Sequence, residues 1–266
     1  MTEIQALILG VVQGLTEFLP VSSSGHLLIV EKLFGVQTES MLTLNVLMHV
    51  GTLLAVFVVY WKRLWEMVMH PIKSDLKWLV VATIPAVIAA LTIDFDAAFE
   101  GNFIGVSYML TTMILMFAQA VSKVRKETKI MHREVRWYDA IAMGHMQAVA
   151  ILPGVSRSGS TIAAGVTTGL SRKRAADFSF LMSVPAILGS LVLELKDIFL
   201  DGAVNIGVGL TPTLIAMAAS AVSGFIAIKF MLAVIRRISF NWFALYTFLL
   251  GAFLLINRNV YPILPI

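Results

Sequence analysis

Two short stretches of the chain carry side chains of the types that bind and cleave phosphates. In the first stretch, Gln13 and Glu17 lie four residues apart and therefore share one face of a helix. A serine-rich turn and an imidazole follow, contributed by Ser22, Ser23, Ser24, Gly25 and His26. Because an ionisable group inside an apolar segment is costly, Glu17 is a candidate for a functional site.

The second stretch repeats this design and adds a cation. It consists of Ser156, Arg157, Ser158, Gly159, Ser160 and Thr161. Serine at the start of a helix usually caps it, and the free N–H groups of a first helical turn also bind anions. The planar guanidinium of Arg157 suits phosphate oxygens. The alternative is a purely structural ion pair between Arg157 and Glu17, and such a pair also fits the resting state of an active site.

The chemistry that this inventory favours is phosphoryl transfer, where positioning and charge neutralisation supply most of the catalysis. We predict as catalytic residues Glu17, Ser23, His26 and Arg157. We predict as substrate-binding residues Gln13, Ser22, Ser24, Gly25, Ser156, Ser158, Gly159, Ser160 and Thr161. Ser23 or His26 attacks phosphorus, or activates a water to do so, with Glu17 as the base. Serine acyl hydrolysis fits less well, because the chain has no G-x-S-x-G elbow.

Two further expectations concern a histidine and the functional class. His49 has no ligand spacing to another histidine, so we expect it to have a packing or interface role. A transporter or lipid flippase is the alternative from another functional class, since broken helices are typical of transporters. The concentration of serine, histidine, glutamate and arginine at one point favours the enzyme.

The elements that position these residues must lie in a membrane. The 266 residues are 58% hydrophobic and only 14% charged, whereas a soluble domain is about 25% charged. With no cysteine, the chain has neither disulfides nor thiolate sites. A helix needs about 20 mostly apolar residues to cross the bilayer. Six stretches qualify, at 43–61, 77–93, 103–121, 175–195, 209–231 and 240–256.

The two polar stretches interrupt further apolar regions, 4–34 and 138–170, whose halves are too short to span alone. Such breaks are tolerated at membrane depth only within protein or a water-filled cavity, so we predict two re-entrant hairpins with breaks at 16–25 and 153–160. Gln13 recurs as Gln147 and Gly25 as Gly159, each 134 residues later. We therefore predict a single all-α membrane domain, 1–266, with internal repeats at about 1–121 and 138–266.

Charge indicates the orientation of this domain. Most of the 20 Lys and Arg residues lie in the segments 62–77, 122–136, 171–174 and 236–239. The positive-inside rule places these segments in the cytoplasm and both termini outside. Three spans separate the hairpins, so the second repeat has inverted topology and the broken tips can meet near the midplane.

Residues 10–26 resemble the first signature of the bacitracin-resistance family, a (Glu/Gln)-x-x-x-Glu motif followed by a serine loop and a histidine. Residues 152–161, Leu-Pro-Gly-Val-Ser-Arg-Ser-Gly-Ser-Thr, are similar to its second signature. The resemblance runs nearly end to end. It implies a phosphatase of the bacterial inner membrane that converts undecaprenyl diphosphate to undecaprenyl phosphate, recycling the lipid carrier for cell-wall synthesis and conferring bacitracin resistance. The alternative above then becomes a transporter or flippase of prenyl phosphate lipids.

The resemblance also has implications for the site. It makes Glu17, His26 and Arg157 essential, and it favours a site that opens to the outer face. It implies a divalent cation, Mg²⁺ or Ca²⁺, which we expect to bridge Glu17 and the diphosphate. Gln13 stands where many members have glutamate, so a metal held by two protein carboxylates does not fit this chain. As partners we expect undecaprenyl diphosphate and membrane lipid but no nucleic acid, and a homodimer is an assembly that the sequence allows.

Overall fold

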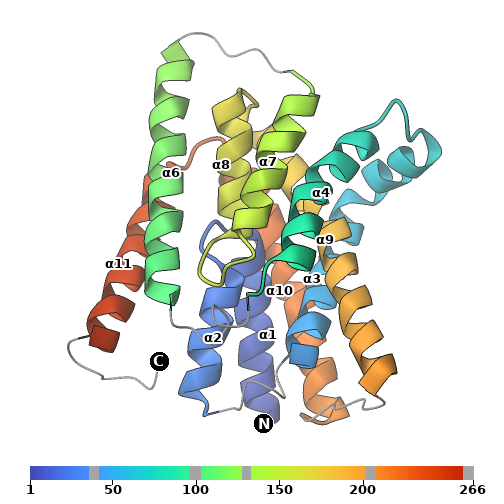
Figure 1. Cartoon of the computed structure of the whole chain (residues 1–266), viewed down its shortest axis with the longest axis vertical. Coiled ribbons are helices and arrows are strands. Elements are labelled where there is room, and N and C mark those ends of the chain that lie inside the picture. The colour runs from blue at the N-terminus through green and yellow to red at the C-terminus, as the bar shows by residue number, and fades with distance from the viewer. Residues whose placement is uncertain (36–41, 96–102, 128–132, 202–207, 260–266) are drawn as a thin grey trace.

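The computed structural model describes residues 1–35, 42–95, 103–127, 133–201 and 208–259, and within these ranges the regular structure is entirely helical. In chain order the helices are α1 (Glu3–Phe18), α2 (Ser23–Leu33), α3 (Leu42–Met69), α4 (Leu76–Thr92), α6 (Ile104–Glu127), α7 (Trp137–Val149), α8 (Arg157–Thr168), α9 (Arg172–Asp201), α10 (Leu210–Val234) and α11 (Phe240–Asn259). They run roughly along the long axis of the molecule, with the start of α1 and the end of α11 towards one end (Figure 1). The all-α prediction is confirmed.

Among the described residues, five helices are long and apolar enough to cross a membrane, so the chain is a multi-pass membrane protein. The qualifying segments are Thr43–Met69, Ile104–Val124, Arg172–Val192, Leu210–Val234 and Phe240–Arg258. Each corresponds to one of the predicted spans. The sixth predicted span, 77–93, is the apolar helix α4, which has 17 residues. Because this is shorter than the usual requirement of about 20 residues, its crossing of the membrane stays a prediction.

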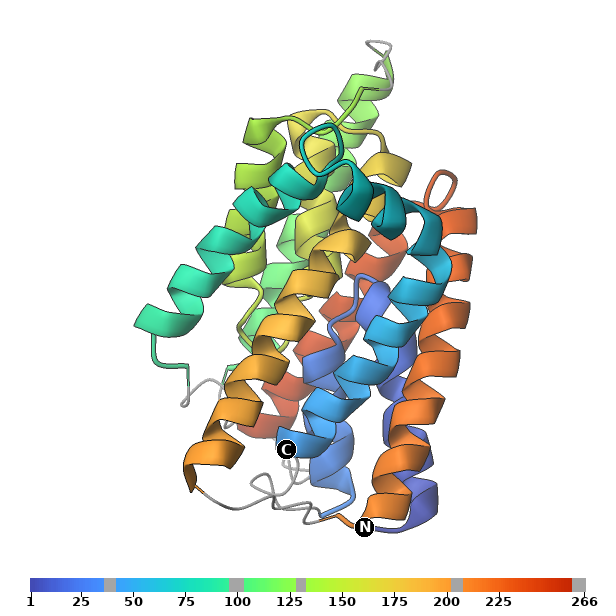
Figure 2. The ribbon, with the colours of Figure 1, turned by 90° about the vertical axis from the view of Figure 1, so that its right-hand side faces the viewer.

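The remaining helices form two short helix–loop–helix pairs. Helices α1 and α2 are joined by residues 19–22, and α7 and α8 by residues 150–156. The pairs enter from opposite ends of the molecule, and their loops meet in its middle (Figures 1 and 2). Part of the basic segment 122–136, at 128–132, lies outside the described residues.

The two breaks differ in extent from those predicted, and side-chain hydrogen bonding explains the difference. Helix α1 continues through Thr16 and Glu17, because the Thr16 hydroxyl donates to its own helix at Val12 O over 2.7 Å. Polar residues therefore do not end the helix there. The second break lies earlier than 153–160, because Ser156 caps α8 and the residues after it form the first helical turn.

Small residues allow the half-helices to approach the long helices closely. A Cβ placed on Gly10 of α1 would lie 2.3 Å from the carbonyl oxygen of Ala216 in α10. In the second pair, a Cβ on Gly144 of α7 would lie 2.6 Å from the carbonyl oxygen of Ala82 in α4. Such backbone-to-backbone contact is the usual way in which helices associate in lipid.

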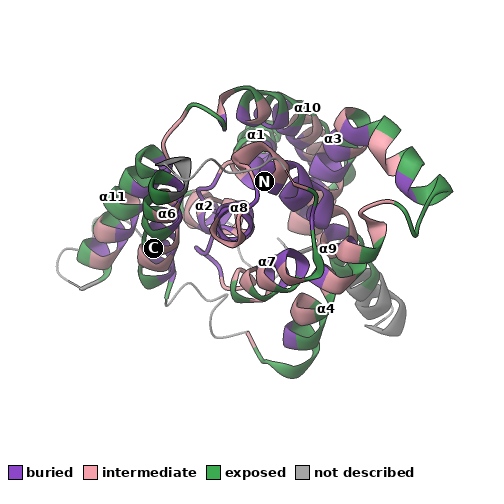
Figure 3. Cartoon of the chain, turned by 90° about the horizontal axis from the view of Figure 1, so that it is seen from above, coloured by how far each residue is buried: buried purple, intermediate pink, exposed green. Residues whose placement is uncertain are grey.

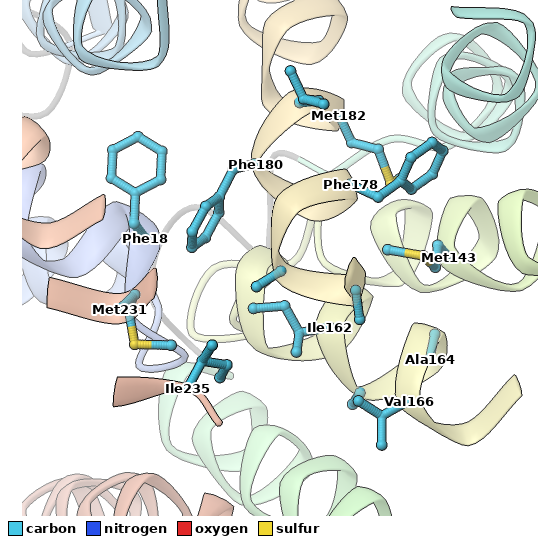
Figure 4. Close-up of a cluster of buried hydrophobic side chains, with 14 of the residues drawn as sticks. Phe18, Met143, Ile162, Ala164, Val166, Phe178, Phe180, Met182, Met231 and Ile235 are labelled. Carbon is cyan, nitrogen blue, oxygen red and sulfur yellow. The ribbon is translucent and has the colours of Figure 1, made fainter. Parts of the chain in front are cut away.

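Buried residues gather around α1, α2 and α8, whereas exposed residues lie on the outer sides of the long helices (Figure 3). The main apolar cluster packs directly beside the polar stretches (Figure 4). In this cluster, Phe18 of α1 meets Phe180 of α9 edge-to-face, with ring centroids 5.4 Å apart. Ile162 of α8 belongs to the same cluster and is fully buried. The packing therefore fixes the elements that carry Glu17 and Arg157.

Candidate active site

Glu17 is the centre of the polar cluster between the two loops. Its side chain is 6% exposed. One carboxylate oxygen, Oε2, accepts hydrogen bonds from Ser23 Oγ at 2.6 Å and from Gln13 Nε2 at 3.1 Å. The other, Oε1, accepts from Arg157 Nη2 in a short ion pair. Both oxygens of the buried carboxylate are thus satisfied by side chains from three elements.

Arg157 brings the second helix pair to this carboxylate. It is the first residue of α8, and besides Glu17 it donates from Nη1 to the backbone oxygen of Ser179 in α9 at 3.3 Å. The structure therefore contains the Glu17–Arg157 pair that the sequence offered as the alternative to a phosphate clamp. Nη2 of the guanidinium contacts a single oxygen of the Glu17 carboxylate. Arg157 therefore does not form with Glu17 the two parallel hydrogen bonds that it can form with a phosphate.

The first serine loop is shaped by Ser22, the N-cap of α2. Its hydroxyl accepts from Gly25 N at 3.4 Å and lies 3.4 Å from Ser24 Oγ. Ser22 has φ +69°, a conformation in the left-handed region that costs energy for a residue with a side chain. The turn that this conformation creates places the next residue, Ser23, with its hydroxyl against Glu17.

The second serine loop has the same capping hydrogen bonds, although Ser156 has an ordinary φ of −71° where Ser22 has +69°. Ser156 Oγ accepts from Gly159 N at 3.0 Å and lies 3.4 Å from Ser158 Oγ. Two further bonds hold this loop in place. Ser158 Oγ donates to Leu19 O in the first loop at 2.8 Å, and Thr111 of α6 accepts from Ser156 N at 3.0 Å. The first turns of α2 and α8 are therefore brought to one place.

Two of the predicted binding residues are enclosed within the protein. Ser160 and Thr161 are both 0% exposed. The Thr161 hydroxyl bonds to Arg157 O at 2.8 Å and lies 2.7 Å from Ser179 Oγ. Thr161 therefore supports the backbone and surroundings of Arg157.

His26 lies on the side of α2 that faces α6 and α11. Its Nδ1 is 2.6 Å from Ser22 O, and its Nε2 is 2.6 Å from the hydroxyl of Tyr246. Because a carbonyl only accepts, Nδ1 carries the proton, and a neutral imidazole then accepts the Tyr246 proton at Nε2. Tyr246 also stacks on the ring, and Tyr108 approaches its edge. Within the described residues, no hydrogen bond joins His26 to Glu17 or Arg157.

The expectation of a packing or interface role for His49 is wrong, because it lies in the polar cluster. Its Nε2 is 3.5 Å from Glu17 Oε2, and its Nδ1 is 2.7 Å from Asn45 O. The signal that could have found it is the spacing of Asn45, His49 and Thr52, which forms a polar stripe on one face of an apolar span. Tyr246 gives no comparable signal, because a tyrosine in a membrane helix is ordinary.

The hard oxygen donors around Glu17 fit a divalent cation that takes its other ligands from substrate and water. Gln13 Oε1 is buried beside the carboxylate and has no hydrogen-bond partner among the described residues. An amide oxygen and a carboxylate are ligands that Mg²⁺ and Ca²⁺ accept. The described residues contain no group of three or more histidine, cysteine, aspartate or glutamate side chains arranged to hold a metal. Protein ligands alone therefore do not make a complete metal cage in this part of the chain.

The arrangement combines a hydroxyl bonded to a buried carboxylate, a guanidinium opposite it, and the N-terminal ends of two helices. A hydroxyl 2.6 Å from a carboxylate can transfer its proton. The N-terminal ends of α2 and α8 and the Arg157 charge favour an anion between them. These groups suit nucleophilic attack on a phosphate.

Comparison with known proteins agrees with this chemistry. The curated relatives include the undecaprenyl-diphosphatase of Carboxydothermus hydrogenoformans, which is 38% identical over 261 residues covering 96% of this chain and 97% of the relative. Undecaprenyl-diphosphatase 4 of Bacillus cereus is 39% identical over 258 residues, with coverage of 96% and 97%. The undecaprenyl-diphosphatase of Alkaliphilus metalliredigens is 37% identical over 280 residues, with coverage of 96% and 98%. A family model described as bacitracin resistance protein BacA matches residues 6–253, and the chain belongs to that family.

Proposed function

We propose that this chain hydrolyses undecaprenyl diphosphate to undecaprenyl phosphate and inorganic phosphate. The reaction returns the carrier lipid to cell-wall synthesis and confers resistance to bacitracin, in keeping with the family and with the names of the relatives. The observation that carries the proposal is the 2.6 Å hydrogen bond from Ser23 Oγ to Glu17 Oε2, formed opposite Arg157. This bond joins a nucleophile to a base, and a cation that can bind phosphate contacts the other oxygen of the same carboxylate.

The diphosphate binds between the first turns of α2 and α8. Backbone N–H groups at these helix ends, the hydroxyl of Ser24 and the Arg157 guanidinium are the donors available to phosphate oxygens. The prenyl chain leaves the site sideways between helices and enters the lipid. Gly25 and Gly159 allow neighbouring side chains to pack closely against these turns, since a Cβ on Gly25 would lie 2.6 Å from the Tyr108 hydroxyl and one on Gly159 3.1 Å from Pro20 Cβ.

Binding of substrate exchanges the partners of Arg157. In the resting structure its Nη2 bonds to Glu17 Oε1, which neutralises the carboxylate. A diphosphate carries more negative charge than one carboxylate and accepts both arms of the guanidinium. When Arg157 turns to the phosphate, Glu17 loses its counter-charge and becomes a base for the Ser23 proton. The ion pair is thus a resting state that substrate itself opens.

The first chemical step forms a covalent intermediate. Ser23 Oγ attacks the terminal phosphorus while its proton passes to Glu17 Oε2, and the bond from that phosphorus to the bridging oxygen breaks. Undecaprenyl phosphate leaves with the electron pair of that bond. Arg157 and the helix N-termini offset the charge that gathers on the phosphoryl oxygens in the transition state.

The second step releases inorganic phosphate. A water attacks the phosphorus of phosphoserine and gives its proton to His26 Nε2, which carries a lone pair in the tautomer that Ser22 O selects. The bond from phosphorus to Ser23 Oγ breaks, and that oxygen takes its proton back from Glu17. For this step, His26 exchanges its bond to the Tyr246 hydroxyl for one to the water.

A divalent cation, Mg²⁺ or Ca²⁺, belongs to the same proposal. Glu17 and the free Oε1 of Gln13 would hold it together with phosphate oxygens. When bound, such an ion neutralises negative charge on the phosphates.

We further propose six membrane crossings, with α4 as the sixth, and two re-entrant pairs related as inverted repeats over about 1–121 and 138–266. The support is the matching of local geometry at an offset of 134 residues. Ser22 and Ser156 cap equivalent first turns, those of α2 and α8. Gly10 and Gly144 make the same kind of backbone contact. The excess of basic residues at the end opposite the start of α1 supports placing that end in the cytoplasm of a bacterial inner membrane. In this arrangement both termini lie outside and the site opens to the outer face.

Phosphate release from a prenyl diphosphate by the purified protein tests the function. We expect Ser23→Ala to reduce release at least a hundredfold, the usual contribution of a catalytic group. The matched control is Ser190→Ala, which removes an exposed serine hydroxyl of α9. The proposal is overturned if the wild-type protein moves intact prenyl diphosphate across liposomes without releasing phosphate, the result expected of a flippase.

A further inference from the structure

A cavity of about 690 Å³ opens at the basic end of the molecule, away from the candidate active site. It lies between the last turns of α3, the turn at 70–75 and the first turns of α4, with the start of α9 as its inner wall. In Figure 1 this region is the end of α3 and the beginning of α4, at the end opposite the start of α1. We call it the lysine groove, after Lys62, Lys73 and Lys77, which line it.

The inner wall of the lysine groove is a fixed ion-pair network. Asp75 accepts from Arg63 Nη2 at 2.6 Å, and Arg174 Nη2 reaches both of its carboxylate oxygens, at 2.9 and 2.8 Å. Arg174 also contacts Glu134. Asp75 is therefore already neutralised by two arginines, which leaves Glu66 as the one lining acid without a basic partner among the described residues.

The three lysines, by contrast, have no acidic partner among the described residues. Lys62, Lys73 and Lys77 are exposed, and within the described ranges their one ring contact is that of Lys77 with Trp78, at 5.0 Å. Five basic and three acidic side chains line the cavity, which leaves it positively charged. Such a surface attracts a phosphate group.

The positive surface continues into a smaller neighbouring cavity of about 180 Å³, which shares Arg174 and Glu134 with the lysine groove. There the Asp139 carboxylate offsets the charge of Arg133. The hydrogen bonds between these two side chains also raise the pKa of Arg133. Arg236 lines this cavity without an acidic partner in the described part of the chain. The smaller cavity therefore extends the surface but offers fewer free cations.

An apolar stripe runs along the same segment, next to Lys62 but on the side of α3 away from Arg63 and Met67. After a kink at Tyr60 (φ −106°, ψ 16°), the last turns of α3 expose Trp61 and Trp65, whose rings stack at 6.0 Å. Val68 and Ile72 continue this exposed side and are 67% and 80% exposed. Tryptophan beside lysine is typical of the boundary between lipid head groups and acyl chains. The same segment thus offers cations to a head group and an apolar face to its acyl chains.

We propose that the lysine groove binds the head group of an anionic phospholipid from the leaflet that borders the basic end of the molecule. The phosphodiester lies among Lys62, Lys73 and Lys77, and the acyl chains lie along the stripe that begins at Trp61 and Trp65. A zwitterionic phospholipid binds more weakly, because its own ammonium group competes with the lysines. A soluble phosphate also binds more weakly, since it makes no use of the apolar stripe. This site shares no residue with the diphosphate site.

The test uses the full-length protein in neutral detergent and phosphatidylglycerol with brominated acyl chains, which quench nearby tryptophan fluorescence. We expect saturable quenching that phosphatidylcholine with the same chains does not produce at equal concentration. The triple change Lys62→Gln, Lys73→Gln and Lys77→Gln should weaken binding about fivefold per lysine, on the order of a hundredfold together. Lys123→Gln, Arg136→Gln and Arg237→Gln form the matched control, because they remove the same charge from the same end outside the groove.

The outcomes separate a specific lipid site from diffuse attraction and from a soluble-phosphate site. Retained binding in the control variant with loss in the groove variant supports the proposal. Equal loss in both variants overturns it, since diffuse charge would then account for binding, and so does saturable quenching by phosphatidylcholine at equal strength. Displacement of the brominated lipid by millimolar inorganic phosphate would assign the site to soluble phosphate instead. If the triple variant does not fold, the single changes Lys73→Gln and Lys77→Gln provide the same comparison, each with a fivefold expectation.

Discussion

Ser158 of α8 and Leu19 of the first loop are joined by a hydrogen bond of 2.8 Å, which the serine hydroxyl donates to the leucine carbonyl. This bond crosses from one helix pair to the other directly beside the Glu17–Arg157 contact. The two loops are therefore a single unit, and a change in either one is expected to alter the site.

Ser158→Ala should destabilise the protein by about 0.5–1.5 kcal/mol, because it removes the hydrogen bond between the two loops while the Leu19 carbonyl keeps its bond from Val21 N. It should also reduce turnover, since the bond that is lost holds the loop before Arg157 against the loop that carries Ser23. Thermal melting in detergent and phosphate release measure the two effects. An unchanged melting temperature would show that the loops are held together by other contacts.

Arg157→Lys separates a phosphate clamp from a structural ion pair. Lysine keeps the charge beside Glu17 but loses the planar fork, so we expect a folded protein that has lost most of its turnover. If the pair is mainly structural, Arg157→Met leaves a buried carboxylate unpaired, which lowers the free energy of unfolding by about 3–5 kcal/mol. The double change Arg157→Met with Glu17→Gln would then restore the melting temperature. A destabilised Arg157→Lys rescued by Glu17→Gln would contradict the clamp.

Gln13 should set the affinity for a divalent cation. A chelator is expected to abolish phosphate release, and added Mg²⁺ or Ca²⁺ to restore it. Gln13→Glu adds a charged ligand beside Glu17 and should lower the half-saturating metal concentration several-fold, whereas Gln13→Ala should raise it. The measurement is a metal titration of activity and, independently, of thermal stability. The same half-saturating concentration in all three proteins would place the ion elsewhere.

Tyr246→Phe removes the hydroxyl that bonds to His26 Nε2 but keeps the stacked ring. We expect turnover to fall about tenfold, equivalent to about 1.4 kcal/mol, because the imidazole loses one of its two orienting bonds. Tyr108→Phe is the matched control, since its hydroxyl approaches Nδ1, whose proton is already directed at Ser22 O. Equal effects of the two substitutions would argue against a specific role for the Nε2 bond.

Gly10→Ala tests the close contact between α1 and α10. The added Cβ would lie 2.3 Å from the backbone of Ala216, so the helices must separate, and we expect a destabilisation of about 1–3 kcal/mol. Gly189→Ala in α9 is the control, because a Cβ there meets nothing within 4 Å and alanine favours the helix by about 0.5–1 kcal/mol. Opposite shifts in melting temperature are the expected result. A fully stable Gly10→Ala would show that this contact can yield.

Local features of the fold could be predicted from the sequence, because they depend on neighbours along the chain. The apolar runs predicted the long helices, and the helical spacing of Gln13 and Glu17 predicted that they share a face, where they are now seen to be hydrogen-bonded. Ser156 caps α8 in the way that serine before a helix generally does. The boundaries of the breaks were less predictable, since a polar residue such as Thr16 can satisfy its hydroxyl inside a helix.

Contacts between distant segments were decided by the tertiary structure alone. The sequence left the partner of Arg157 open between phosphate and Glu17, and the packing of α8 against α1 brings those residues, 140 positions apart, into contact. It gave no reason to join His26 to Tyr246, 220 positions away, and it assigned His49 to packing. Residue types and spacing specify which groups are available, because they fix the local backbone. Which of these groups meet depends on how apolar helix faces pack together, and many packings satisfy the same hydrophobic pattern.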